Sequence, residues 1–155
     1  MNEAAKASLV VRVPTPIWLI ILVVAALLAN WLLEPPVLLK YAPAGIALVI
    51  LGIAVAASGR LTFKFRGAEI FPWSEKHSTL VVTGPFRLTR NPMYLGLVTI
   101  GLGAALWAGT WLMWLVPIVI FALDNFIIIP FEEKSMERAY GDEYRAYRAR
   151  VRRWI

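Results

Sequence analysis

Residues 80–96, LVVTGPFRLTRNPMYLG, combine groups that suit a small anionic ligand. The guanidiniums of Arg87 and Arg90 stand just before Asn91-Pro92, where a long uncharged segment begins. This pair is typical of a helix start, with Asn91 as the N-cap and Pro92 as the first helical residue. Because a helix start offers free backbone N–H groups and partial positive charge, the segment predicts a carboxylate or phosphate site. The alternative is that both arginines reach lipid headgroups and Asn91 only caps the helix.

A second polar cluster lies in and after the next apolar segment. Asp124 falls inside that segment, and Glu132 and Glu133 follow it. A carboxylate inside a membrane is costly and is expected to face the bundle interior or a wet cavity. Asp124 and Glu132 are two four-residue steps apart, so one helix would place both roughly on one face. The alternative for Glu132 and Glu133 is ordinary surface pairing with Lys134 or Arg138.

Apolar segments of membrane length separate these clusters. Of the 155 residues, 59% are hydrophobic and 17% are charged, a balance that is rare in soluble domains. A membrane span needs about 20 residues, so the 33 uncharged residues 91–123 form two spans that break at Gly109-Thr110. The sequence therefore predicts a single all-α integral membrane domain over residues 1–155, with four transmembrane helices, C-terminal amphipathic interfacial helices and no Rossmann domain. The expected spans are residues 14–33, 41–59, 92–108 and 111–130.

The distribution of charge predicts the orientation. With four spans, the N-terminus, the loop 60–91 and the tail 131–155 share one side and carry fifteen of the 16 basic residues. Lys40 alone stands on the other side. By the positive-inside rule, both termini and both polar clusters face the cytoplasm from an inner or plasma membrane. The net charge of +6 then reflects attraction to anionic lipid headgroups and requires no nucleic acid.

The tail is expected to form two short helices that separate at Gly141. Along it runs an apolar stripe at helical spacing: Tyr140, Tyr144, Tyr147, Val151 and Trp154. A basic amphipathic helix of this kind lies at the membrane interface, closes as a lid over a cavity, or does both. Cysteine is absent and His77 is the single histidine, so no metal site is expected.

Two motifs in a fixed order point to a family. They are LVVTGPFRLTRNPMYLG (80–96) and FEEKSMERAYGDEYRAYRARVRRW (131–154), with one apolar hairpin between them. Together they resemble the isoprenylcysteine carboxyl methyltransferase and phospholipid methyltransferase superfamily of small membrane enzymes, in a bacterial type. The sequence departs from the family pattern at Asn91, often a histidine, and at Phe86, usually a tyrosine. The matching positions are Leu80, Val81, Gly84, Pro85, Phe86, Arg87, Arg90, Asn91, Pro92, Met93, Tyr94, Glu132, Glu133, Tyr140, Gly141, Glu143, Tyr144 and Tyr147.

The resemblance implies a methyltransferase that uses S-adenosylmethionine and acts on a lipophilic or small-molecule acceptor from the bilayer. The acceptor group is left open as a carboxylate, an amine or a thiol. Residues 126–129 lack the basic residue that the prenylcysteine branch carries, which argues against a prenylcysteine carboxylate. The residues expected to contact the cofactor are Thr79, Leu80, Val81, Gly84, Phe86, Asn91, Pro92, Met93, Tyr94, Glu132 and Tyr144.

Three further residues are candidates for catalysis: Arg90, Asp124 and Glu133. Arg90 suits the carboxylate of the cofactor, and one glutamate of the pair 132–133 suits its ammonium or ribose hydroxyls. Asp124 suits an amine or another protonatable nucleophile, as an orienting acceptor or a base.

Two other functions fit the same residues. A non-enzymatic small membrane protein or transporter subunit would use Asp124 as a proton site and bind no cofactor. A reductase similar to the sterol reductases would bind a nicotinamide dinucleotide, whose phosphates require more arginines than residues 80–96 clearly offer. Thermal stabilisation by each cofactor separates these cases, because a ligand stabilises the protein that binds it.

Overall fold

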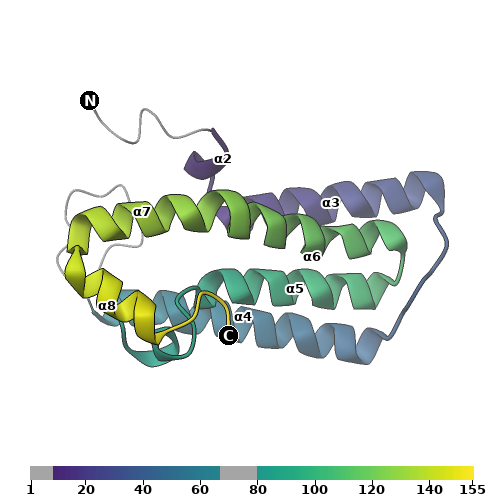
Figure 1. Ribbon diagram of the computed structural model, residues 1–155. Coiled ribbons are helices and arrows are strands. Elements are labelled where there is room, and N and C mark those ends of the chain that lie inside the picture. The colour runs from purple at the N-terminus through teal and green to yellow at the C-terminus, as the bar shows by residue number, and fades with distance from the viewer. Residues whose placement is uncertain (1–8, 67–79) are drawn as a thin grey trace.

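The computed structural model describes residues 9–66 and 80–155 of the chain. Four long helices, α3 to α6, lie side by side, and the chain runs from α6 without interruption into α7 (Figure 1). The helical elements in chain order are α2 (Leu9–Arg12), α3 (Thr15–Leu33), α4 (Ala42–Phe65), the 3-10 turn η1 (Gly84–Arg87), α5 (Pro92–Ala108), α6 (Trp111–Leu123), the π-helical turn η2 (Asp124–Ile128), α7 (Ile129–Tyr140) and α8 (Asp142–Arg150).

Within the described part of the chain, three helices are long and apolar enough to cross a membrane. They are α3, α4 and the continuous helix Trp111–Tyr140. The fourth long helix, α5, is apolar but has only 17 residues. Large side chains such as Ile20, Ile50 and Ile118 point outward and are about 60% exposed, which suits contact with lipid. The protein is therefore an all-helical integral membrane protein, and the count of four spans stays a prediction.

Two helices extend beyond the ranges expected from the sequence. Helix α4 continues to Phe65, so the first residues of the expected loop 60–91 are helical. The last long helix does not stop near residue 130 but continues to Tyr140. A π-helical turn explains this, because the backbone N–H of Ile129 donates to the carbonyl of Asp124, five residues earlier. The wider turn accommodates Pro130, which would otherwise clash with the preceding turn.

Glycines bring α4 and α5 into backbone contact. A Cβ atom at Gly52 would lie 2.6 Å from the carbonyl oxygen of Gly96, and one at Gly103 would lie 2.6 Å from that of Gly45. Small residues are favoured between membrane helices, since apolar side chains gain little by leaving lipid and close backbone packing supplies the attraction. The backbones of the two helices therefore come into contact at these glycines.

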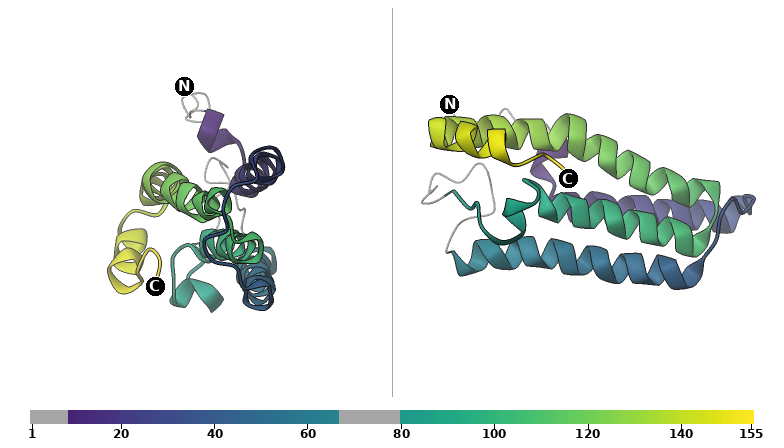
Figure 2. Two further views of the ribbon diagram at one scale, coloured as in Figure 1. Left: turned by 90° about the vertical axis from the view of Figure 1, so that its right-hand side faces the viewer. Right: turned by 60° about the horizontal axis from the view of Figure 1, so that its bottom comes forward.

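The two ends of the bundle differ in what they collect. At one end, the hydroxyl of Thr110 donates to Oδ1 of Asn30 in α3 at 2.9 Å, and the backbone N–H of Leu38 donates to the carbonyl of Gly109 at 2.8 Å and joins the two interhelical turns. At the other end lie α2, η1, α7, α8 and the C-terminus, as Figures 1 and 2 show. Segments from the beginning, middle and end of the sequence meet there, and this end holds the candidate site. Its location on the cytoplasmic side stays a prediction from charge.

Candidate functional site

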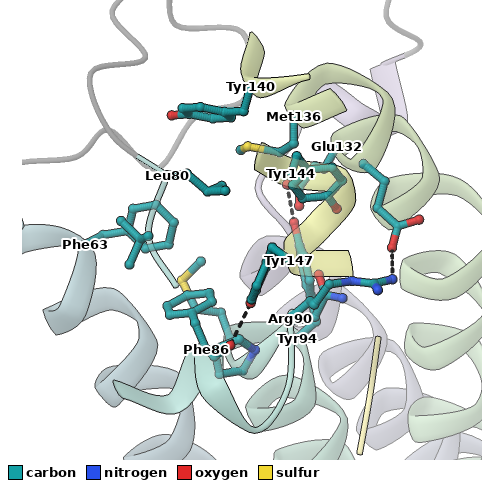
Figure 3. A pocket seen from close by; sticks show the side chains of 15 residues that line it. Phe63, Leu80, Phe86, Arg90, Tyr94, Glu132, Met136, Tyr140, Tyr144 and Tyr147 are labelled. Carbon is teal, nitrogen blue, oxygen red and sulfur yellow. Dashed lines mark hydrogen bonds and ion pairs between the residues drawn. The ribbon is translucent and has the colours of Figure 1, made fainter. Parts of the chain in front are cut away.

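A cavity of about 110 Å³ lies where the start of α5, the helix α7 and the tail helix α8 come together (Figure 3). The end of α4 and the turn η1 complete its wall. Its lining residues are Phe63, Leu80, Val81, Phe86, Arg90, Asn91, Pro92, Met93, Tyr94, Glu132, Glu133, Met136, Tyr140, Tyr144 and Tyr147. We call this space the tail cavity.

Most of the site residues expected from the sequence line the tail cavity. Eleven of the fourteen do so, including Arg90, Glu132 and Glu133. Gly84 does not: it begins η1 with a left-handed φ of 62°, where glycine is favoured. Asp124 also lies outside the wall of this cavity. Thr79 lies outside the described residues.

An ion-pair cluster forms one side of the tail cavity. Arg90 donates to Oε1 of Glu133 at 2.6 Å, and Arg153 donates to Oε2 at 2.6 Å and through its Nε to Oε1 at 3.2 Å. Glu133 is only 7% exposed, so neither arginine meets a well-hydrated carboxylate. These charge-assisted contacts therefore hold Glu133 in its ionised form and fix its position. This arrangement excludes the alternative of surface pairing for Glu133.

Arg90 also binds the C-terminal segment to the start of α5. Its NH1 donates to the carbonyls of Arg148 at 3.0 Å and Val151 at 2.9 Å, and its backbone N–H donates to that of Arg152 at 3.0 Å. The Nε of Arg90 is buried and has no hydrogen-bond partner. Three of the five N–H groups of the guanidinium are thus occupied by protein acceptors, and Nε is one of the two that remain.

Asn91 is the N-cap residue of α5 and Pro92 begins the helix, as expected, but the side chain of Asn91 does not cap the helix, so that part of the prediction was wrong. No side-chain hydrogen bond caps this helix start. Instead, Nδ2 of Asn91 and the hydroxyl of Thr89 both donate to the carbonyl of Arg153, each at 3.0 Å. The C-terminal segment supplies an acceptor that the sequence near Asn91 does not reveal, and the amide turns toward it.

Tyrosine hydroxyls join the remaining walls. Tyr94 donates to Oε1 of Glu132 at 2.5 Å, and Tyr147 donates to the carbonyl of Phe86 at 2.7 Å (Figure 3). Burial raises the pKa of Tyr144 to about 12, with the charge of Glu133 acting in the same direction. Burial also raises the pKa of Tyr147 well above its ordinary value. Both tail tyrosines therefore remain protonated at physiological pH.

Asp124 lies deeper in the bundle and is 0% exposed. The hydroxyl of Thr15 lies close enough to Asp124 to make a weak stabilising contact, and that of Tyr94 also faces it, but no hydrogen bond of standard geometry reaches either carboxylate oxygen. A buried polar group without a partner costs about 1–3 kcal/mol, and more when it is charged. The π-helical turn that begins at Asp124 is itself a feature that is frequent at functional sites. The position of Asp124 is thus costly for the fold.

A second cavity, of about 460 Å³, lies among the N-terminal segment, α4, α5 and the π-helical turn. We call it the apolar cavity, because most of its wall is hydrocarbon. Met93, Tyr94 and Glu132 belong to the walls of both cavities. The hydrogen bond between Tyr94 and Glu132 therefore stands at the boundary between them. The residues that line the apolar cavity are Val11, Val13, Pro14, Thr15, Pro16, Ile53, Ala56, Ala57, Arg60, Met93, Tyr94, Leu97, Ile100, Ile128 and Glu132.

Sequence reasoning missed Arg153 and Asn125. NH1 of Arg153 lies 3.3 Å from both the carbonyl and the side-chain oxygen of Asn125, and Nε1 of Trp154 donates to that side-chain oxygen at 3.0 Å. Pro130 was the available signal. In a π-helical register the carbonyl five residues before Pro130 is that of Asn125, and a proline cannot donate to it. Such a carbonyl needs another donor, and the arginine-rich tail provides one.

Comparison with known proteins shows the family of the chain. The family model for phospholipid methyltransferases matches residues 39–143, from the approach to α4 as far as the start of α8. The chain therefore belongs to the phospholipid methyltransferase family, as the two motifs predicted. An uncharacterised protein of Haemophilus influenzae is 44% identical over 63 residues, which are 41% of this chain and the whole of that protein. No solved structure matches the chain. Family and fold together support a membrane methyltransferase.

Proposed function

We propose that the protein is an S-adenosylmethionine-dependent methyltransferase with its cofactor in the tail cavity and a lipophilic acceptor in the apolar cavity. One observation carries this proposal: the two cavities share the side chains of Met93, Tyr94 and Glu132. Ligands in the two cavities would meet at these residues. When bound, S-adenosylmethionine supplies an electrophilic methyl group, and proximity to the acceptor accounts for a large part of the rate enhancement.

The donor set of the tail cavity fits this cofactor. The carboxylate of Glu132 accepts hydrogen bonds from ribose hydroxyls or from an ammonium group. The rings of Phe86 and Tyr144 offer faces for adenine or for a sulfonium. The unpartnered Nε of Arg90 offers one donor to a carboxylate. Since pockets for ligands of this size usually have about 300–1,000 Å³, the tail has to move outward from its 110 Å³ arrangement to admit the cofactor.

The residues at the boundary have separate roles in this proposal. Glu132 orients the nucleophile of the acceptor, because it is the carboxylate that both cavities share. Tyr94 fixes Glu132 through its hydrogen bond. Asp124 lies in the wall of neither cavity, so it acts as a positioning residue through the facing hydroxyls of Tyr94 and Thr15. Arg90 and Glu133 hold the tail that covers the cofactor.

Ligand-induced thermal stabilisation of the purified full-length protein in detergent tests the proposal. S-adenosylmethionine at about 100 times its Kd is expected to add about 2.7 kcal/mol of stability, and a nicotinamide dinucleotide is expected to add none. Transfer of a labelled methyl group into a lipid extract is then measured for Glu132→Gln and for the surface control Glu137→Gln. The expected result is loss of transfer in the first variant and full transfer in the second. Stabilisation by the dinucleotide alone would refute the assignment.

A further inference from the structure

The apolar cavity has a charged group at one edge. Ile53, Ala57 and Arg60 line it from α4 at steps of four and three, so they lie on one face of that helix. Arg60 is the last of them and lies near the end of the helix, at the same level as the start of α5. Gly59, its neighbour, packs against Met93 and Pro92. The cavity thus runs from a guanidinium at the bundle end toward Leu97 and Ile100 within the bundle.

Arg60 is exposed. No hydrogen bond or ion pair reaches it from the described part of the chain. Arg90, Arg145 and Arg153 differ, since each pairs with a carboxylate. A guanidinium binds a carboxylate or a phosphate through two parallel hydrogen bonds, and such bonds strengthen where water is partly excluded. The charge of Arg60 next to a hydrocarbon wall therefore matches an anionic group attached to a hydrocarbon chain.

The volume of the cavity limits the hydrocarbon. A water-sized group takes about 30 Å³, so 460 Å³ corresponds to roughly fifteen such groups. A methylene group is of similar size. One chain of about fifteen carbons would therefore fill the space, and a pair of such chains would not fit.

We propose that the apolar cavity binds an amphiphile with one hydrocarbon chain, and that Arg60 selects those with an anionic group, either a carboxylate or a phosphate. The assignment of this amphiphile as the methyl acceptor rests on the proposed function. Its nucleophile would lie toward Tyr94 and Glu132, and its anion at Arg60. Arg60 is then a specificity-determining residue, although the recognised motifs do not include it.

Equilibrium binding to the purified full-length protein in a non-ionic detergent tests this proposal without catalysis. The probes are hexadecanoate, hexadecyl phosphate and the neutral hexadecanol. Hydrogen bonds to a charged group contribute about 1.5–3 kcal/mol, so at least one anion should bind about tenfold or more tightly than the alcohol. Arg60→Gln should reduce this preference to below about threefold. Lys64→Gln is the matched control, because Lys64 is exposed one turn further along α4 and does not line the cavity.

A second variant tests the location of the chain. Ala57→Trp places an indole in the cavity from an exposed position of α4, and it should weaken all three probes. Equal binding of hexadecanol and both anions, or unchanged anion binding in Arg60→Gln or Ala57→Trp, would overturn the proposal. Stabilisation by S-adenosylmethionine is measured on the same samples. If the unmodified protein is not stabilised by S-adenosylmethionine but still prefers the anions, the proposed function is refuted; if it is stabilised by S-adenosylmethionine but shows no preference for the anions, the role of Arg60 is refuted.

Discussion

Replacement of Asp124 should make the protein more stable and less active. Asp124 is fully buried and both of its oxygens lack hydrogen-bond partners, so the folded state bears the cost of removing a polar group from water. That cost is about 1–3 kcal/mol for a neutral group and more for a charged one. Asp124→Leu keeps the branching of the side chain and removes its polar atoms, although its larger volume offsets part of the gain at a fully buried position. For a chain of this length each kcal/mol corresponds to about 2–4 °C, so the midpoint of thermal unfolding should rise by about 2–12 °C.

Thermal unfolding of the detergent-solubilised protein, followed by the fluorescence of its seven tryptophans, measures the change. Thr110→Val is the matched control, since Thr110 is also a buried polar residue but donates to Asn30. Its loss should destabilise the fold by about 1 kcal/mol. Methyl transfer should fall in Asp124→Leu and also in Asp124→Asn. If Asp124→Leu instead lowers the midpoint, then the carboxylate has a stabilising partner and the reasoning fails.

Two further changes test the packing and the tail. Gly52→Leu should reduce stability by about 3 kcal/mol or more, since its Cβ would lie 2.6 Å from the Gly96 carbonyl. Gly101→Ala should cost less, because the atom nearest to its Cβ is 3.3 Å away. Equal effects of the two changes on thermal unfolding would contradict close contact between α4 and α5. The raised pKa of Tyr144, about 12, and the raised pKa of Tyr147 mean that their contribution to stability is complete below about pH 10 and is lost as the pH rises toward 12. Unfolding midpoints measured against pH should therefore be flat from this source up to about pH 10, and Tyr147→Phe, which also loses the bond to Phe86, should remove part of the later decline.

The helical framework was predictable because it follows from local rules. Uncharged segments of membrane length marked the long helices, and Gly109 ends α5 in the left-handed conformation that glycine favours. Gly141, with a positive φ of 52°, separates α7 from α8, as expected. The extension of the last helix to Tyr140 was not predictable by these rules. Pro130 indicates an interruption, and only the π-helical turn before it lets the helix continue.

The residues that line the candidate site were largely predictable, but their contacts were less so. Arg90 and the pair Glu132 and Glu133 were expected to serve one ligand, and the structure places all three in the wall of one cavity. The contacts of Arg90 with the tail could not be predicted, because two of its acceptors there are the backbone carbonyls of Arg148 and Val151, and every residue has such a carbonyl. The role of Arg153 could not be predicted either, because the sequence alone does not distinguish it from the other arginines of the tail.

The glycine contacts between α4 and α5 also bear on how an acceptor travels. No hydrocarbon chain fits between α4 and α5, because their backbones are in contact at these glycines. Within the described residues, α3 and α4 barely touch, and the start of α3 and one face of α4 both line the apolar cavity. In the proposed function, an acceptor from the bilayer would thus enter between α3 and α4, beside the closely packed α4–α5 pair.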